Sequence, residues 1–270
     1  MKDLAVVVSN DNQGVTPYET IDAIVNAGFK NVFLQWYDED YKKFEVPQLE
    51  QYKYVKEKGL NVIFNHLGYR GINNIWLDGN EGEELVKKYI RNLDEMKEIG
   101  VDLVVMHICV GYDAPPVSNI GLARFKRICE YAKELGIKIA FENTKVKGYQ
   151  EYILDNIDLD NIGICYDSGH AHCHFKDDYD FKRFKDRIMC VHIHDNYGEI
   201  DDHLIPYDGT LDFDMVLRGL KEANYSEYLT LELCYRNEYT SMDINDFYKK
   251  GYDVGMTLKK KYKEVKWKSH

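Results

Sequence analysis

The sequence lacks a long hydrophobic run. No stretch of about 18 apolar residues occurs, so the sequence predicts no membrane-spanning helix. The apolar run at residues 4–8 is too short for the core of a signal peptide, and no cleavage-site pattern follows it. We interpret this run as a first β-strand and expect a cytoplasmic protein.

Cysteine pairs of the kind that form disulfide frameworks or zinc fingers are also missing. The sequence has six cysteines and no C-x-x-C pair. Four of them lie in or beside apolar, strand-like runs, which indicates reduced and mostly buried thiols: Cys109, Cys165, Cys190 and Cys234. Cys129 falls on a helical pattern. We expect a solvated loop for His172-Cys173-His174, because no second pair at finger-like spacing exists.

Positive charge is scarce. The chain has 35 lysines and arginines against 46 acidic residues, a net charge of −11, which argues against a nucleic-acid partner. With 270 residues, 44% of them hydrophobic, the chain can bury a large core. No linker or composition break divides it, so we expect one domain over residues 1–270.

A helical pattern that stops at a glycine just before an apolar strand occurs four times, at Gly28, Gly59, Gly100 and Gly136. Such joints are typical of repeated β-α units. Strands are predicted near 3–9, 31–36, 61–67, 101–108, 138–143, 161–167, 188–194 and 228–234. Helices are predicted near 17–28, 47–59, 81–99, 119–135, 148–156, 176–186, 211–223 and 243–263. Eight units in about 270 residues predict an α/β fold, the (β/α)8 TIM barrel.

Six successive predicted strands end in a histidine or an acidic residue: His66, His107, Glu142, Asp167, His192 and Glu232. Residues at the carboxyl ends of barrel strands face the mouth, where barrel enzymes place their catalytic groups. Carboxylates packed together repel one another, and a divalent cation removes that repulsion. Mixed carboxylate and imidazole ligands suit Zn²⁺, Mn²⁺, Fe²⁺ or Co²⁺.

The segments around these residues resemble the xylose isomerase-like barrel superfamily: Phe141-Glu142-Asn143, Cys165-Tyr166-Asp167-Ser168-Gly169-His170, Val191-His192-Ile193-His194-Asp195-Asn196 and Leu231-Glu232-Leu233. The resemblance covers nearly the whole chain. This superfamily includes sugar isomerases and epimerases, inosose and dehydroshikimate dehydratases, and apurinic-site endonucleases.

The resemblance implies one divalent metal, which could be Zn, Mn, Co, Fe or Mg, held by Glu142, Asp167, His192 and Glu232. It places His170 beside the metal, in contact with substrate. The endonuclease branch binds further metals, and its extra ligands fall on His66, His107, His170, Asp201 and His203, so a second or third metal stays open. His194 stands where many relatives have a lysine, which leaves its role open.

The main hypothesis is a metal-dependent isomerase or epimerase of a small ketose, aldose or related polyol. The metal would stabilise an enediolate, Glu142 and Glu232 would transfer the proton, and His170 would orient a substrate hydroxyl. Trp36, Tyr37 and Tyr69 are candidates for an apolar wall. No glycine-rich phosphate cradle appears, which favours an unphosphorylated substrate.

Three alternatives remain. A dehydratase of a cyclitol or hydroxy-ketone would use the same enolate chemistry. An apurinic-site endonuclease with several zinc ions would hydrolyse a phosphodiester. A non-catalytic sugar sensor would keep the barrel, although such a protein need not retain both glutamates. The sequence fixes neither the substrate nor the number of subunits, so a homo-oligomer stays open.

Overall fold

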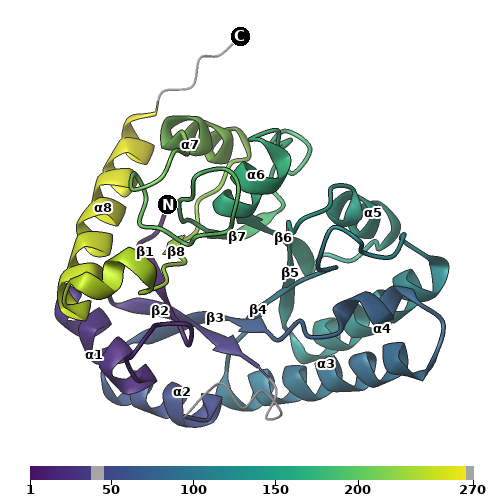
Figure 1. Ribbon diagram of the computed structural model, residues 1–270. Coiled ribbons are helices and arrows are strands. Elements are labelled where there is room, and N and C mark those ends of the chain that lie inside the picture. Colours follow the sequence, from purple (N-terminus) through teal and green to yellow (C-terminus); the bar gives the residue numbers. More distant parts are fainter. Residues whose placement is uncertain (38–45, 266–270) are drawn as a thin grey trace.

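The computed structural model describes residues 1–37 and 46–265 as a ring of parallel strands inside a ring of helices (Figure 1). The strands are β1 (Leu4–Val8), β2 (Asn31–Trp36), β3 (Asn61–Leu67), β4 (Leu103–Met106), β5 (Lys138–Glu142), β6 (Ile162–Asp167), β7 (Ile188–His192) and β8 (Leu229–Leu231). The helices are α1 (Pro17–Ala27), α2 (Gln48–Glu57), α3 (Asn80–Ile99), α4 (Asn119–Leu135), α5 (Tyr149–Asn156), α6 (Ser168–Phe175), α7 (Phe213–Glu222) and α8 (Ile244–Glu264). The 3₁₀ helices η1 (Ile72–Trp76) and η2 (Asn237–Ser241) follow β3 and β8.

The strands are hydrogen-bonded in the order β7-β6-β5-β4-β3-β2-β1-β8, and all the pairs are parallel. Ile193, just past β7, closes the ring by bonding to β8 and the residue after it. Its N–H donates to the carbonyl of Thr230 at 2.8 Å, and its carbonyl accepts from the N–H of Glu232 at 3.1 Å. The predicted (β/α)8 barrel is therefore confirmed.

The inside of the barrel is filled by an apolar layer, to which β1 to β7 contribute one side chain each: Val7, Phe33, Phe64, Val105, Ala140, Cys165 and Cys190. The rings of Phe33 and Phe64 stack at 4.6 Å between centroids. Because this layer fills the barrel, polar side chains that follow it on the same strands can be reached only from the mouth.

Three of the four glycine joints predicted from the sequence cap helices, and Gly59 lies one residue past Lys58, the C-cap of α2. Gly28, Gly100 and Gly136 are the C-caps of α1, α3 and α4, each in the left-handed conformation that favours glycine. On the outside of the barrel, α8 packs against α1 and α7 (Figure 1). Within the described residues, every helix is too short or too polar to span a bilayer.

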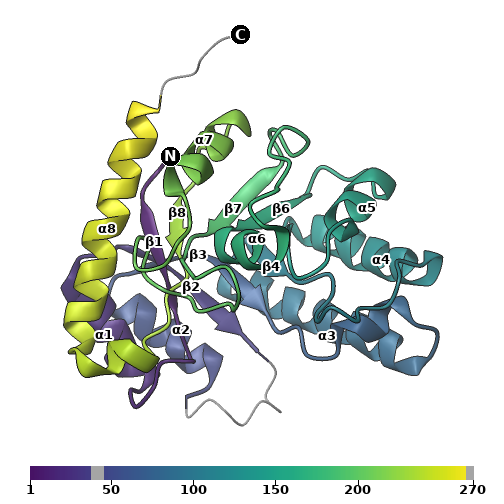
Figure 2. The same cartoon turned by 45° about the horizontal axis from the view of Figure 1, so that its top comes forward.

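The predicted helix near residues 176–186 is wrong. The helix α6 begins directly after β6, where the carboxylate of Asp167 caps it by accepting from the N–H of His170, and it ends at Lys176 in a left-handed conformation. The residues that follow form turns, in which Phe181 and Phe184 are buried and cover the barrel as a helix otherwise would. Figure 2 shows α6 beside the ends of β6 and β7.

The loop predicted for residues 172–174 is wrong for the same reason, because these residues lie on α6. The prediction of reduced and mostly buried thiols fits the structure. All six cysteines are free, and only Cys173 is not fully buried. β4, β7 and β8 are shorter than predicted, because regular pairing stops where the polar residues of the mouth begin.

Candidate metal centre

Four side chains from consecutive strands meet at the mouth of the barrel. Glu142, Asp167 and His192 are the last residues of β5, β6 and β7, and Glu232 directly follows β8. One potential ligand atom from each lies within 4.8 Å of the others. All four are buried, with Asp167 and His192 fully so. The parallel register of the strands thus places three carboxylates around one imidazole, away from water.

The Nδ1 atom of His192 lies among these carboxylates. It is 3.3 Å from Glu232 Oε2, 3.5 Å from Glu142 Oε1 and 3.7 Å from Asp167 Oδ2. Neither ring nitrogen has a hydrogen-bond partner among the described residues, although both are buried. Ligands bound tetrahedrally at about 2.0–2.2 Å lie about 3.3–3.6 Å apart. This spacing and the unsatisfied nitrogen fit a divalent cation between the four side chains.

The electrostatics of the group depend on its histidines. Burial alone would raise the pKa of Glu142, but the charge of the nearby His192, together with hydrogen bonds from His107 and His170, outweighs it and holds that pKa well below its usual range. The pKa of Asp167 is also held well below its usual range, because the nearby His170 and His194 outweigh the effect of burial. Burial would lower the pKa of His192, yet Glu232 and Glu142 raise it well above 6.5. A positive charge at this position, from a proton or a metal, is therefore needed.

Two more histidines meet the other side of the Glu142 carboxylate. The Nε2 atom of His66 lies 2.9 Å from Glu142 Oε2, and that of His107 lies 3.3 Å from the same oxygen. These three residues form a second group of potential ligands. Burial lowers the pKa of His107, more than Glu142 raises it, so this imidazole is neutral and able to bind a metal.

A third group surrounds Asp201, in the loop after β7. The Asp201 Oδ2 atom lies 3.0 Å from Nε2 of His203 and 3.2 Å from Nε2 of His170. The pKa values of both histidines are raised, because the negative charge of Asp201 and, for His170, of Asp167 outweighs the effect of burial. The structure thus brings together all nine residues that the sequence predicts for the site.

Three of the histidines are oriented by a common pattern. Their Nδ1–H donates to a backbone carbonyl while Nε2 faces a carboxylate: His66 to Leu67, His170 to Asn143 and His203 to Glu232. With Nδ1 as the donor, a neutral imidazole points the lone pair of Nε2 at an anion, which is unfavourable unless a proton or a cation lies between them. Metal-binding histidines in proteins are commonly held in this way.

Two buried residues of the segment after β7 support the site, and sequence reasoning missed what they do. His194 donates from Nε2 to both oxygens of Asp167 at 3.1 Å. The carboxylate of Asp195 accepts four backbone N–H groups, which fixes the loop that positions the third group of ligands: Asn196, Tyr207, Gly209 and Leu211. The motif around His192 gave a signal for both residues, but the contacts depend on the folded loop.

A small cavity of about 80 Å³ opens at the mouth above these groups. Tyr37 and Tyr69 line it, and Tyr69 stacks on His107 at 4.0 Å, so two of the three predicted aromatic residues are part of this wall. Trp36 is not among the described lining residues, and its indole N–H donates to Glu95 instead. Sequence reasoning missed Arg236, which also lines the cavity.

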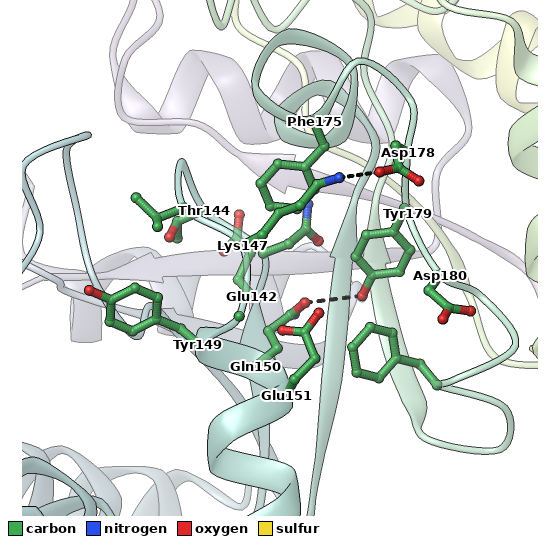
Figure 3. Close-up of a pocket in the computed structure, with 14 residues that line it drawn as sticks. Glu142, Thr144, Lys147, Tyr149, Gln150, Glu151, Phe175, Asp178, Tyr179 and Asp180 are labelled. Atoms are coloured by element: carbon green, nitrogen blue, oxygen red, sulfur yellow. Dashed lines mark hydrogen bonds and ion pairs between the residues drawn. The ribbon is translucent and has the colours of Figure 1, made fainter. Parts of the chain in front are cut away.

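A larger cavity of about 290 Å³ lies beside the mouth, between α5 and the turns after α6 (Figure 3). Two pairs of its polar side chains are bonded to each other: Lys147 with Asp178 at 2.6 Å, and the hydroxyl of Tyr179 with Gln150 at 3.1 Å. The carboxylate of Glu142, by contrast, is held by the histidines of the mouth. The concentration of potential ligands therefore makes the smaller cavity the candidate site.

Comparison with known proteins agrees with this geometry. The family model described as xylose isomerase-like TIM barrel matches residues 21–256. The chain belongs to this family. The resemblance to this family that the sequence indicates is therefore confirmed.

Several relatives are named as sugar or cyclitol enzymes. An inosose isomerase from Halalkalibacterium halodurans is 25% identical over 222 residues, which are 73% of this chain and 77% of the relative. A solved structure of L-ribulose 3-epimerase superposes with a TM-score of 0.75 at 16% identity and full coverage of both chains. The IOLI protein, solved with a bound zinc atom, has a TM-score of 0.73 at 18% identity and covers 97% of this chain and 99% of its own.

Proposed function

We propose that this protein is a divalent-metal-dependent isomerase or epimerase that acts on a small ketose, aldose or related polyol. The observation that supports it best is the buried Nδ1 atom of His192 among three carboxylates. Two of the relatives named above are an inosose isomerase and an L-ribulose 3-epimerase, and the IOLI protein was solved with zinc. In the proposal, Glu142, Asp167, His192 and Glu232 hold the metal, and the mouth cavity binds the substrate.

The bound metal would act as a Lewis acid that polarises the substrate carbonyl and stabilises the enediolate. Side chains of the protein must remove one proton from a carbon of the substrate and return one proton to a carbon of the substrate. Glu142 is surrounded by His66, His107 and His170, which stabilise its ionised form and make it a weak base. Glu232 has fewer such neighbours, so we assign to it the removal of the proton.

The returning proton would reach the substrate from the Glu142 side. His170 lies 3.2 Å from Glu142 Oε1, so a proton can pass between these two side chains. Glu142 and His170 together can therefore deliver a proton to a face different from the one that Glu232 approaches. Delivery to the same carbon gives an epimer, and delivery to the neighbouring carbon gives an isomer.

The test combines elemental analysis with incubation of the metal-loaded protein in D₂O, using a panel of ketoses and cyclitols. We expect deuterium to enter the substrate at the reacting carbon, and Glu232→Gln to lower the rate by at least about 100-fold. Glu151→Gln, an acid of the neighbouring cavity, is the matched control. A Glu232→Gln enzyme with the wild-type rate would contradict the mechanism, and loss of water from the substrate would assign a dehydratase.

A second candidate function, a phosphodiesterase of the apurinic-site endonuclease type, is favoured by one observation. The nine ligand-type residues form three neighbouring groups by their contacts, and the second shares Glu142 with the first. Such a set can hold several zinc ions around a phosphate. The net charge of −11 works against binding of nucleic acid.

Metal stoichiometry and a cleavage assay separate the two candidates. Three tightly bound zinc ions per chain, together with cleavage of a duplex that contains one abasic site, would favour the phosphodiesterase. One divalent metal per chain, with epimerisation of a ketose and no cleavage of the duplex, would favour the sugar enzyme. The assay is run at low and moderate salt, because phosphate contacts weaken as salt increases.

A further inference from the structure

One arginine lies at the edge of the mouth cavity. Arg236 follows β8, and among the described residues that line the cavity it is the only lysine or arginine. Its Nη2 donates to the backbone carbonyl of Asp201 at 2.8 Å. The next residue, Asn237, donates its N–H to the side chain of Gln13 at 3.1 Å. Arg236 therefore lies where the loops after β1, β7 and β8 meet.

The guanidinium of Arg236 is not neutralised by the part of the chain that the structure describes. It makes no ion pair with a described carboxylate, and its Nε is buried without a hydrogen-bond partner. Arg127 and Arg183 pair with acidic residues at 2.7 and 2.6 Å. Other described arginines also lack an ion pair, but Arg236 is the one among the described residues that lines the mouth cavity. In a chain with 46 acidic residues, an unpaired cation beside the site calls for a ligand.

Asp201 connects Arg236 to the potential metal ligands. The carbonyl of Asp201 holds Arg236, while the carboxylate of Asp201 contacts His170 and His203. A substrate that reaches the metal groups with its hydroxy-carbonyl end would share this cavity with Arg236. A planar guanidinium donates two parallel N–H groups to one oxyanion, which matches a carboxylate or a phosphate.

We infer that Arg236 binds an oxyanion on the substrate, so that the preferred substrate is a sugar acid or a sugar phosphate rather than a neutral sugar. This inference rests on the proposed isomerase or epimerase function. If the anion is a carboxylate, the inference agrees with the unphosphorylated substrate that the sequence favours. If the anion is a phosphate, the two disagree. A carboxylate and a phosphate would both accept N–H groups from the guanidinium of Arg236, and the experiment distinguishes them.

The experiment compares the metal-loaded wild type with Arg236→Gln on three substrates of one carbon skeleton: a neutral ketose, its terminal phosphate and its terminal carboxylic acid. We expect the wild type to prefer one of the two anions. In Arg236→Gln, kcat/KM for that anion relative to the neutral ketose falls about 10- to 100-fold, mostly through KM. The matched control is Arg70→Gln, an exposed arginine after β3. Arg236→Lys keeps the charge without the planar fork and replaces Arg236→Gln if that variant does not fold.

Equal relative kcat/KM in the wild type and Arg236→Gln overturns the inference and leaves the proposed function intact. If no substrate is turned over, the proposed function fails, and calorimetry with inorganic phosphate and with acetate decides the inference separately. Binding of either ion that weakens at least tenfold in Arg236→Gln, but not in Arg70→Gln, supports an oxyanion site. Equal binding by all the proteins overturns it.

Discussion

The imidazole of His194 lies against the carboxylate of Asp167, with Nε2 at 3.1 Å from both oxygens. Gly169 packs closely against the same imidazole. A Cβ added at Gly169 would lie only 1.9 Å from Cε1 of His194. His194 also stacks on His203 at 4.2 Å with an interplanar angle of 10°. One buried ring therefore orients ligands of two neighbouring groups.

The close approach of Gly169 predicts the effect of adding one methyl group. Gly169→Ala should displace His194, release Asp167 and weaken metal binding about 10- to 100-fold, because residues that orient ligands have effects of this size. The control is Gly255→Ala, whose Cβ meets only leucine side chains, at 3.1 Å and beyond. Calorimetric titration of the metal-free variants with Zn²⁺ checks the prediction. Unchanged affinity in Gly169→Ala would show that His194 does not orient Asp167.

Much of this site could be predicted from the sequence because it depends on strand periodicity. Each apolar run ends where a histidine or an acidic residue begins, and parallel strands bring such ends to one rim. Glu142 and His192, for example, are 50 positions apart in the sequence, yet their side chains approach to 3.5 Å. The residues of the strand ends were therefore found without knowledge of any loop.

The parts that the sequence did not predict depend on contacts between loops. The polar segment after Lys176 has helical spacing, but the helix forms earlier because Asp167 caps it. Arg236 appears in the sequence as an ordinary polar residue, and only its contact with the Asp201 carbonyl places it at the cavity. Local pattern cannot report such contacts, because both partners lie outside regular elements.

The four N–H groups that meet Asp195 predict a specific loss in Asp195→Asn. The amide nitrogen cannot accept, so two of the four hydrogen bonds are lost, at a cost of about 2–4 kcal/mol in the free energy of unfolding. We expect the loop 196–211 to become sensitive to limited proteolysis and the ligand group around Asp201 to lose metal. Asp214→Asn, an exposed acid paired with Lys261, is the control. Resistance to proteolysis equal to that of the wild type would refute the role of Asp195.

Arg124 supports the barrel on the side of α3 and α4. It is 2% exposed, pairs with Glu83 at 2.9 Å and donates to backbone carbonyls between η1 and α3. Arg124→Met removes the donor from these carbonyls, of which that of Ile75 is buried, and should reduce the free energy of unfolding by about 1–3 kcal/mol. Arg127→Met removes only an exposed pair with the same Glu83 and should destabilise the protein less than Arg124→Met. Thermal unfolding of both variants measures the difference, and equal melting temperatures would contradict it.

The raised pKa of His192 predicts that protons and metal compete for the same site. Burial would lower this pKa, but Glu232 and Glu142 raise it well above 6.5, so the metal-free imidazole is protonated at neutral pH. A metal must displace that proton, and its apparent affinity should therefore increase as the pH rises from about 6 to 8. Titration with Zn²⁺ at pH 7 in two buffers of different ionisation enthalpy should show release of about one proton or more per ion.

The same pKa shift determines how the stability of the metal-free protein depends on pH. Because the folded-state pKa lies above the unfolded value, the contribution of His192 is fully present below pH 6.5 and is lost as the pH rises through the folded-state pKa. The melting temperature of the metal-free protein should therefore decrease on the alkaline side, while that of the metal-loaded protein stays nearly constant there. A metal-free protein that becomes more stable on the alkaline side would mean that His192 is neutral in the folded state. The three carboxylates around it would then need another source of positive charge.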